Sequence, residues 1–217
     1  MRSGWFFNTP MWAEYLQEYA KSRPECLHEF RSSPLAKDQD LREALESKEW
    51  VVECHQSQVI DLTTHKWSDV RKSYHSLIHR AQERCEINEE PTIREFKLVH
   101  RCAFGTVRND RTFEIQGSWM PEHAMAVAAV NAKPELSAAA LWIIYQGSAY
   151  YGSAPSVEKN ILHAVIWESL KRLKARGVQL VDMGQVDGAT EKEKNIGTFK
   201  AGFGGELRPF LIAKRKL

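Results

Sequence analysis

The sequence has few cysteines, and none of them is spaced for a metal or redox site. Cys26, Cys54, Cys85 and Cys102 include no C-x-x-C pair. Four unpaired thiols in a reducing compartment are a simpler interpretation than a disulfide framework or a zinc site. The cysteine pattern therefore favours a cytoplasmic protein.

Long hydrophobic runs are also lacking. No apolar stretch approaches the length needed to cross a bilayer. Near the N-terminus, Trp5-Phe6-Phe7 is too short for the core of a signal peptide. We expect no transmembrane segment.

The chain has no strong excess of charge of either sign. Its 217 residues are 43% hydrophobic and 27% charged, which is typical of a globular protein rather than a disordered one. The formal net charge is only +2. Binding to nucleic acid through bulk charge needs many cations on one face, so this mode is disfavoured, although a local basic groove stays open.

Several nucleotide and nucleophile motifs are missing. The sequence contains no P-loop, no G-x-S-x-G elbow, no dinucleotide G-x-G-x-x-G and no R/Q-x-x-G-x-G/A loop for an acetyl-CoA pyrophosphate. The nearest substitute is Gly152-Ser153-Ala154-Pro155, ahead of a helix expected to start near Val157. A helix N-terminus can hold phosphate without a full motif.

Apolar periodicity predicts mostly helices in the first half. Thr9 and Pro10 suit the start of a helix, and a short helix is expected around Leu41 and Leu45. The clearest helix spans 67–86, with one apolar face and one basic face, and others follow at about 92–107 and from Asp110 or Thr112. Val51-Val52 and Val59-Ile60 suggest two short strands. His75 and His79 lie four residues apart, as helical metal ligands do, but no third ligand accompanies them, so a zinc site is disfavoured.

The second half predicts a sheet with a crossover helix. Strands are expected at 124–131, 137–145 and 148–153, with a tight turn at Gln146-Gly147. A helix of about 158–176 ends at Gly177, a strand follows at 178–183, and residues 197–212 are glycine-rich and then strand-like. This order describes an α/β sheet with two packed lobes that meet near 110–122.

Six segments together resemble the FemAB-like family of aminoacyl and acyl transferases, whose members carry GNAT-like domains. They are Phe7–Trp12, Val59–Thr63 with Trp67–Tyr74, Ala149–Ala154, His163–Glu168, Val181–Gly184 and Ile196–Gly205. The resemblance implies a GNAT-like mixed, mostly antiparallel sheet flanked by helices. It further implies a shortened N-terminal lobe, 1–110, containing the basic helix 67–86, and a C-terminal acyltransferase domain, 111–217.

The resemblance also implies a reaction. An acyl or aminoacyl group would pass from aminoacyl-tRNA or acyl-CoA, as co-substrate, to an amine of a cell-envelope (peptidoglycan) or glycan precursor, either phosphorylated or not. No tightly bound cofactor and no metal would be needed. The alternative is a non-catalytic binding or assembly module that keeps the fold, which the shortened N-terminal lobe favours.

Acyl transfer to an amine passes through an oxyanion, which needs a cation or N–H donors. The resemblance implies Lys200, after Phe199, for that charge; the alternative is a surface lysine on a turn. Gly202, Gly204 and Gly205 bracket Phe203, and their backbone either contacts a phosphate or carbonyl or simply forms a tight turn.

Further substrate contacts are expected on both halves. Arg71 and Lys72 lie near a helix start, where cations oppose the helix dipole, so an anionic partner is favoured over solvent; Tyr74 lies in the same resembling segment. Substrate-binding residues are also expected at strand ends, namely Tyr150, Tyr151, Ser153 and Asp182. One tyrosine should point into the core, Asp182 is expected to cap the turn at Gly184, and His163 is expected to be a packed core residue.

Overall fold

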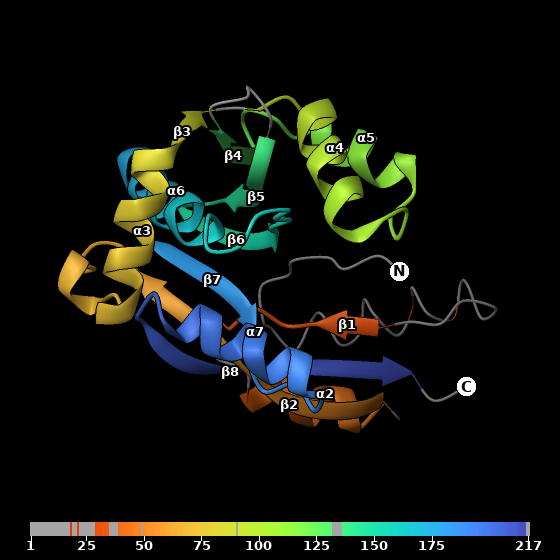
Figure 1. Cartoon of the computed structure of the whole chain (residues 1–217). Helices are drawn as coiled ribbons and strands as arrows, with labels where there is room; N and C mark the ends of the chain where they lie inside the picture. The colour runs from red at the N-terminus through yellow and green to blue at the C-terminus, as the bar shows by residue number, and fades with distance from the viewer. Residues whose placement is uncertain are drawn as a thin grey trace. The chain divides into compact units, whose positions relative to one another are not determined.

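The structure is a computed structural model of the whole chain (Figure 1). It describes residues 18, 21, 29–34, 39–48, 50–89, 91–131 and 136–215. The helix expected after Pro10, the resembling segment at 7–12 and Cys26 lie outside the described residues.

The chain divides into two compact units. Unit 1 comprises Met1–Val59, Gln185–Thr198 and Glu206–Leu217, and unit 2 comprises Ile60–Gly184 and Phe199–Gly205. Each unit therefore combines segments that are far apart in the sequence. The division at 110/111 does not coincide with this grouping and stays a prediction about the domains.

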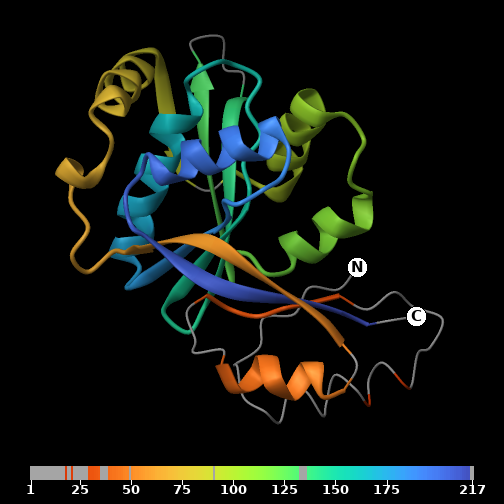
Figure 2. The ribbon, with the colours of Figure 1, turned by 90° about the horizontal axis from the view of Figure 1, so that it is seen from below.

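Unit 1 is built on three antiparallel strands. Strand β8 (Glu206–Arg215) pairs with β1 (Glu29–Arg31) on one side and with β2 (Trp50–Asp61) on the other. Helix α2 (Gln39–Glu46) lies across these strands (Figure 2) and buries Leu41 and Leu45 against Trp50. The short helix around Leu41 is thus confirmed. Strand structure at 51–52 and 59–60 is confirmed, but both stretches belong to one long strand rather than two short ones, because β2 pairs with β8 from Trp50 to Val59.

Unit 2 contains a sheet in the order β7-β6-β5-β4-β3. The predicted antiparallel meander is confirmed as β4 (Ala124–Asn131), β5 (Leu136–Tyr145) and β6 (Ser148–Ser153). Gln146 and Gly147 have φ values of 46° and 73°, as a two-residue hairpin turn requires. A further edge strand, β3 (Cys85–Glu89), pairs with β4.

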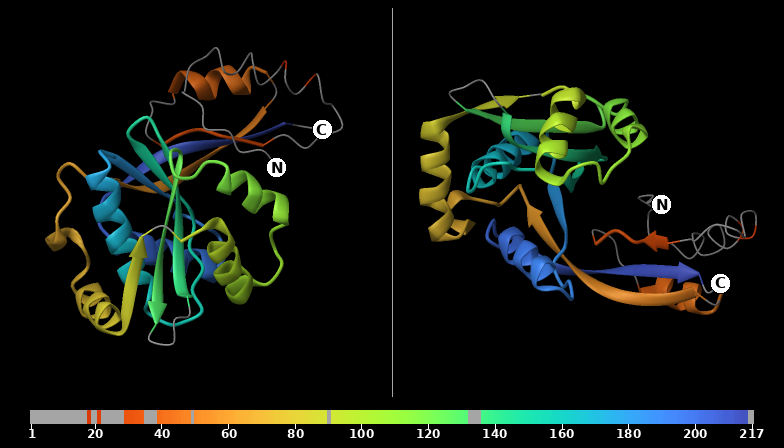
Figure 3. Two further views of the ribbon diagram at one scale, coloured as in Figure 1. Left: turned by 90° about the horizontal axis from the view of Figure 1, so that it is seen from above. Right: turned by 45° about the vertical axis from the view of Figure 1, so that its right-hand side comes forward.

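Alternate residues of the central strands face different helices. Met125, Val127 and Ala129 belong to a core with α3 (Lys72–Arg84) and α6 (Leu162–Ala175). Ala126 and Ala128 belong to a second core with α4 (Ile93–Phe104) and α5 (Asp110–Gly117). The left view of Figure 3 shows the two helix pairs on opposite sides of the sheet. The small, buried side chains of these strands allow both layers to pack closely.

Helix α6 is the predicted crossover connection, and it makes β7 (Leu180–Gln185) parallel to β6. It begins at Leu162 rather than near 158, and Gly177, with φ 81°, follows its end as predicted. The mixed, mostly antiparallel α/β architecture expected from the sequence is therefore confirmed.

The basic helix expected at 67–86 is interrupted. A 3₁₀ turn, η1 (Trp67–Asp69), precedes α3, and extended backbone at Val70 separates them. The Arg71 N–H donates to the Gly202 carbonyl at 2.8 Å, which draws the chain away from a helical path. At the other end, Cys85 already belongs to β3, because pairing with β4 replaces the last helical turn.

The segment ahead of the glycines is helical, whereas the sequence predicted no helix there and described 197–212 as glycine-rich and then strand-like. Helix α7 spans Glu191–Ala201 and ends in the turn that carries Gly202, Gly204 and Gly205. Thr190 and Glu193 form reciprocal bonds at its start, with the Glu193 carboxylate accepting from Thr190 N–H at 2.9 Å. This Thr-x-x-Glu capping box is readable in the sequence.

Candidate functional site

Lys200 lies in the last turn of α7 and is only 8% exposed. Its Nζ is 5.7 Å from the centroid of the Tyr151 ring, a cation–π distance. The ammonium group therefore does not extend into bulk water, as a surface lysine on a turn would. A buried lysine requires compensating interactions, and the cation–π contact with Tyr151 is one of them.

The surroundings of Lys200 are the carboxyl ends of two parallel strands. Pairing of β6 with β7 covers Ser148–Tyr150 against Leu180–Asp182, whereas both strands continue for three more residues. Tyr151 and Gly184 lie in these continuations. In open α/β sheets, ligands bind beyond the carboxyl ends of parallel strands, at such a point.

Gly184 provides the closest approach to the ammonium group. Its φ is 80°, and a Cβ placed there would lie 3.2 Å from Lys200 Nζ and 3.7 Å from the Tyr150 hydroxyl oxygen. The Gly184 N–H donates to Asp182 Oδ1 at 2.7 Å, which confirms the capping interpretation of this buried aspartate. The turn thus holds Lys200, Tyr150 and Asp182 together around one glycine.

The two adjacent tyrosines differ in environment. Tyr151 packs against the core that contains Trp142, with ring centroids 5.2 Å apart, and burial raises the pKa of its hydroxyl. Tyr150 is partly exposed and lies beside Gly184. The expectation that one tyrosine serves the core is confirmed for Tyr151, which also lies beneath the Lys200 ammonium.

Arg108 is a further cation near this site, and the sequence analysis missed it. It lies between α4 and α5 and is partly buried, and its charge acts on Tyr150 and on the buried His100. Burial lowers the pKa of the guanidinium. Among the described residues no carboxylate forms an ion pair with Arg108. No motif marks it, because its significance comes from proximity to a residue far away in sequence.

The glycines after Lys200 are explained largely by close packing. A Cβ at Gly202 would lie 2.2 Å from the Tyr74 ring, and one at Gly204 would lie 2.9 Å from the Asp69 carbonyl oxygen. Phe203 is fully buried, and its carbonyl lies 2.7 Å from His65 Nε2. Gly205 has φ 88°. Phe203 is thus a core residue, which corrects its expected place among the substrate contacts.

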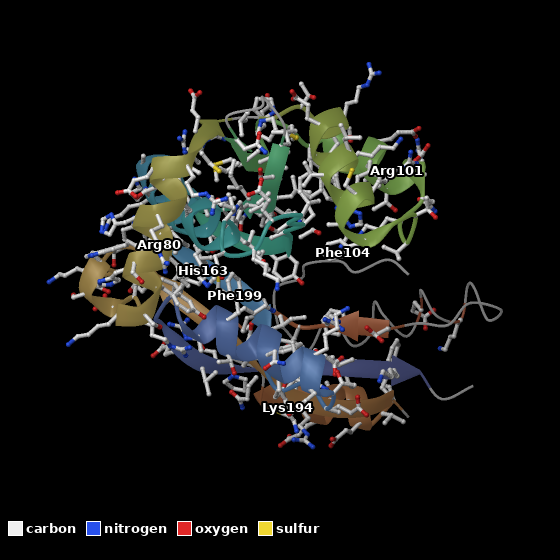
Figure 4. The ribbon with its side chains drawn as sticks, in the orientation of Figure 1. Arg80, Arg101, Phe104, His163, Lys194 and Phe199 are labelled. Carbon is white, nitrogen blue, oxygen red and sulfur yellow. The ribbon has the colours of Figure 1, made fainter. Side chains whose placement is uncertain are left out.

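Four rings gather beside the end of α7: Tyr74, His163, Phe199 and Phe203. Tyr74 donates its hydroxyl hydrogen to the Phe199 carbonyl at 3.3 Å, and burial raises the pKa of this phenol. The His163 ring lies 5.1 Å from the Phe199 ring, and Figure 4 shows the two labelled side by side. This aromatic cluster fixes the helix turn from which Lys200 projects.

The remaining predicted contacts are less well supported. Arg71 and Lys72 are exposed, and the Arg71 guanidinium lies 5.3 Å from the Tyr74 ring centroid, so part of its role is structural. Ser153 is partly buried on β6. The segment 152–155 does not adjoin a helix N-terminus, because α6 starts only at Leu162; this corrects its proposed phosphate role.

His75 and His79 on α3, which have the spacing of helical metal ligands, both contact Trp67. His75 Nε2 lies 3.0 Å from the Val70 carbonyl and 3.2 Å from the Trp67 carbonyl, and its ring stacks on Trp67. Over the described ranges, no three His, Cys, Asp or Glu residues form a group suited to a metal ion. In the same part of the chain, no helix is long and apolar enough to span a bilayer.

Comparison with known proteins gives agreement in structure only. Neither protein-family models nor curated protein sequences match the chain. FemX matches with a TM-score of 0.66 at 12% identity, over 96% of this chain and 79% of FemX. L-PGS from Bacillus licheniformis matches with a TM-score of 0.66 at 13% identity, over 92% and 71% of the two chains. A GCN5-related N-acetyltransferase from Kribbella flavida matches with a TM-score of 0.56 at 12% identity, over 96% and 77%.

The chain has a FemAB-like GNAT fold. The resemblance read from the six sequence segments is thereby confirmed at the level of architecture. At these identities the agreement concerns the fold, and the activity of this GNAT-fold chain has to be argued from its own residues.

Proposed function

We propose that this GNAT-fold chain transfers an acyl or aminoacyl group from an activated donor to an amine, with Lys200 stabilising the oxyanion. The observation that carries the proposal is the burial of the Lys200 ammonium at the carboxyl ends of β6 and β7, next to Gly184 and Tyr151. A transferase fold shared with FemX and with the GCN5-related enzyme supports the same class of reaction.

The chemistry follows from the charge. When the amine nitrogen attacks the donor carbonyl, the carbonyl oxygen acquires a negative charge. A cation already held in a water-poor site stabilises that charge without reorganising, whereas a solvated lysine has to be desolvated first. The cation–π contact with Tyr151 and the tight turn at Gly184 restrict where the ammonium can move.

Substrate binding would use the groups around Tyr150. Arg108 supplies a positive charge on the α4–α5 side of the sheet, and Tyr150 supplies a hydroxyl beside Gly184. These groups suit an anionic acceptor, such as a phosphorylated cell-envelope or glycan precursor. Arg71 and Lys72, exposed at the start of α3, would contact the phosphates of the donor, either aminoacyl-tRNA or acyl-CoA.

The test compares two lysines of the same helix. Lys200→Met keeps the length of the side chain and removes the charge, and Lys194→Met does the same at an exposed position (Figure 4). With donors and acceptors screened as pairs, we expect Lys200→Met to lower kcat by about 10²–10³-fold, as loss of an oxyanion donor does. Lys194→Met should leave kcat unchanged.

Three results are informative. A Lys200→Met variant with full activity would refute the role of this lysine. Thermal shifts measured with CoA and with aminoacyl-tRNA at fixed salt identify the donor. A wild-type chain that binds a donor and transfers nothing would instead support the alternative, a non-catalytic module that keeps the fold.

A further inference from the structure

His163 lies in the first turn of α6, and its ring is held by contacts on several sides. The Tyr74 and Phe199 rings meet it edge-on at centroid distances of 4.4 Å and 5.1 Å, and Phe203 lies 6.3 Å away. Nδ1 lies 3.3 Å from the Asn160 carbonyl oxygen. Asn160 itself has φ 68°, a left-handed conformation that asparagine adopts more readily than most residues other than glycine.

The hydrogen bond to Asn160 defines the tautomer. A backbone carbonyl only accepts, so Nδ1 carries the hydrogen and Nε2 carries the lone pair in the neutral ring. Within the described part of the chain, no residue forms a hydrogen bond with Nε2. The ring is therefore fixed by its Nδ1 side, and its basic nitrogen is left for another group.

The surroundings also favour the neutral ring. Burial lowers the pKa of His163, and this effect outweighs the opposing effect of the Asn160 carbonyl. The positive end of the α6 dipole acts in the same direction as burial. Among the described residues, the titratable side chain in ring contact with His163 is Tyr74 of α3, and the guanidinium of Arg71, which precedes α3, lies 5.3 Å from the centroid of the Tyr74 ring. A neutral imidazole with a fixed tautomer is a competent proton acceptor near pH 7.

We propose that His163 is the general base that accepts the proton of the acceptor amine, an inference that rests on the proposed acyl transfer. The amine nitrogen forms a bond to the donor carbonyl carbon, and the carbonyl π electrons move onto the oxygen beside Lys200. Nε2 takes the proton from the nitrogen. When the tetrahedral intermediate collapses, the bond to the leaving oxygen or sulfur breaks and the imidazolium returns the proton to it.

Two features connect His163 with Lys200. Phe199, whose ring contacts the imidazole, directly precedes Lys200, so both groups lie at the same end of α7. Tyr74 contacts His163 and donates to the Phe199 carbonyl, which links the base and the lysine through one rigid cluster.

The first arm of the test needs no substrate. Diethylpyrocarbonate acylates unprotonated imidazole nitrogens, and peptide mass spectrometry reports the rate for each histidine between pH 5 and 8. We expect His163 to react with a midpoint below the ordinary value of about 6.5, with exposed His79 as the internal control. A protected His163, or a midpoint at or above the ordinary value of about 6.5, would overturn the proposal.

The second arm measures transfer with the pair found for the wild-type chain. His163→Phe keeps an aromatic ring and His163→Gln keeps polarity, and both should lower kcat by about 10²–10⁴-fold with little change in the donor KM. The acidic limb of the pH profile should disappear in both variants, whereas Lys200→Met should retain it. A His163→Gln variant that keeps kcat and the acidic limb would contradict the proposal.

The two arms separate the underlying hypotheses. If His163 reacts as expected but the wild-type chain transfers no group, the proposed acyl transfer is wrong and the role of His163 in it falls too. If transfer occurs and only the His163 variants behave as wild type, acyl transfer stands and this base is wrong.

Discussion

Gly184 allows the position of the Lys200 ammonium to be tested without changing its charge. In Gly184→Ala, the new methyl carbon would lie 3.2 Å from Nζ and 3.5 Å from the Tyr150 ring. Nζ is the end of a flexible side chain, so it can move by a few tenths of an ångström at small energetic cost. The left-handed backbone at φ 80° adds about 1–2 kcal/mol of destabilisation for a residue with a Cβ.

Gly177→Ala is the matched control. Gly177 has φ 81°, and a Cβ there would meet no atom within 4 Å. Both variants should therefore lose similar stability, about 1–2 kcal/mol, or roughly 2–8 °C in melting temperature for a chain of this size.

The two variants should differ in catalysis. Displacing a catalytic group by about 1 Å can cost about 10²-fold, so a shift of a few tenths of an ångström in Gly184→Ala should lower kcat by roughly 3- to 10-fold relative to Gly177→Ala. Urea unfolding and transfer kinetics on the same preparations provide the comparison. Equal activity of the two variants would refute the argument that Gly184 sets the position of the ammonium.

Three further predictions follow from the described contacts. Gly202→Ala places a carbon 2.2 Å from the Tyr74 ring and should lower the free energy of unfolding in urea by about 1–3 kcal/mol. Tyr74→Leu in the double variant should partly relieve this loss. Full stability of Gly202→Ala would contradict the close packing. Arg108→Gln should raise the KM for an anionic substrate without lowering the melting temperature. The control Arg111→Gln, at an exposed ion pair with Glu114, should change neither quantity. If Arg108→Gln has the same KM as the wild-type chain, Arg108 does not belong to the site. Burial lowers the pKa of both His100 and His163, so these two residues bind more protons in the unfolded chain than in the folded chain. The free energy of unfolding should therefore fall as the pH decreases below about 6.5. Replacing both histidines by Gln should flatten this dependence between about pH 6.5 and 5.

The local signals in the sequence identified most elements of unit 2. Alternating small residues, the Gln146-Gly147 turn and the apolar stripe of α6 predicted the meander and its parallel crossover, since each depends on nearby residues. Helix α7 was not predicted, although Thr190 and Glu193 form a capping box, because the glycine-rich sequence at its end is typical of a turn. The break at Val70 had no local signal, since it depends on a hydrogen bond from Arg71 to the distant Gly202.

The candidate site also contains residues that the sequence predicted and residues that only the structure revealed. Resemblance of the segment around Phe199 and Lys200 singled out a lysine that proves to be buried, and the expected capping by Asp182 is confirmed. Arg108 and His163 gained their significance only in three dimensions. Arg108, between α4 and α5, interacts electrostatically with Tyr150 of β6, and the His163 ring contacts residues of α3 and of the end of α7.

The sequence by itself determined the α/β class, the order of most strands and helices, and the residue types available for acyl transfer, because periodicity, turn chemistry and short motifs act over a few residues. Only the tertiary structure decided that Lys200 is buried beside Gly184, that Phe203 belongs to the core and that burial lowers the pKa of His163. Burial and pKa depend on which distant segments pack together, and that information is absent from any single stretch of the chain.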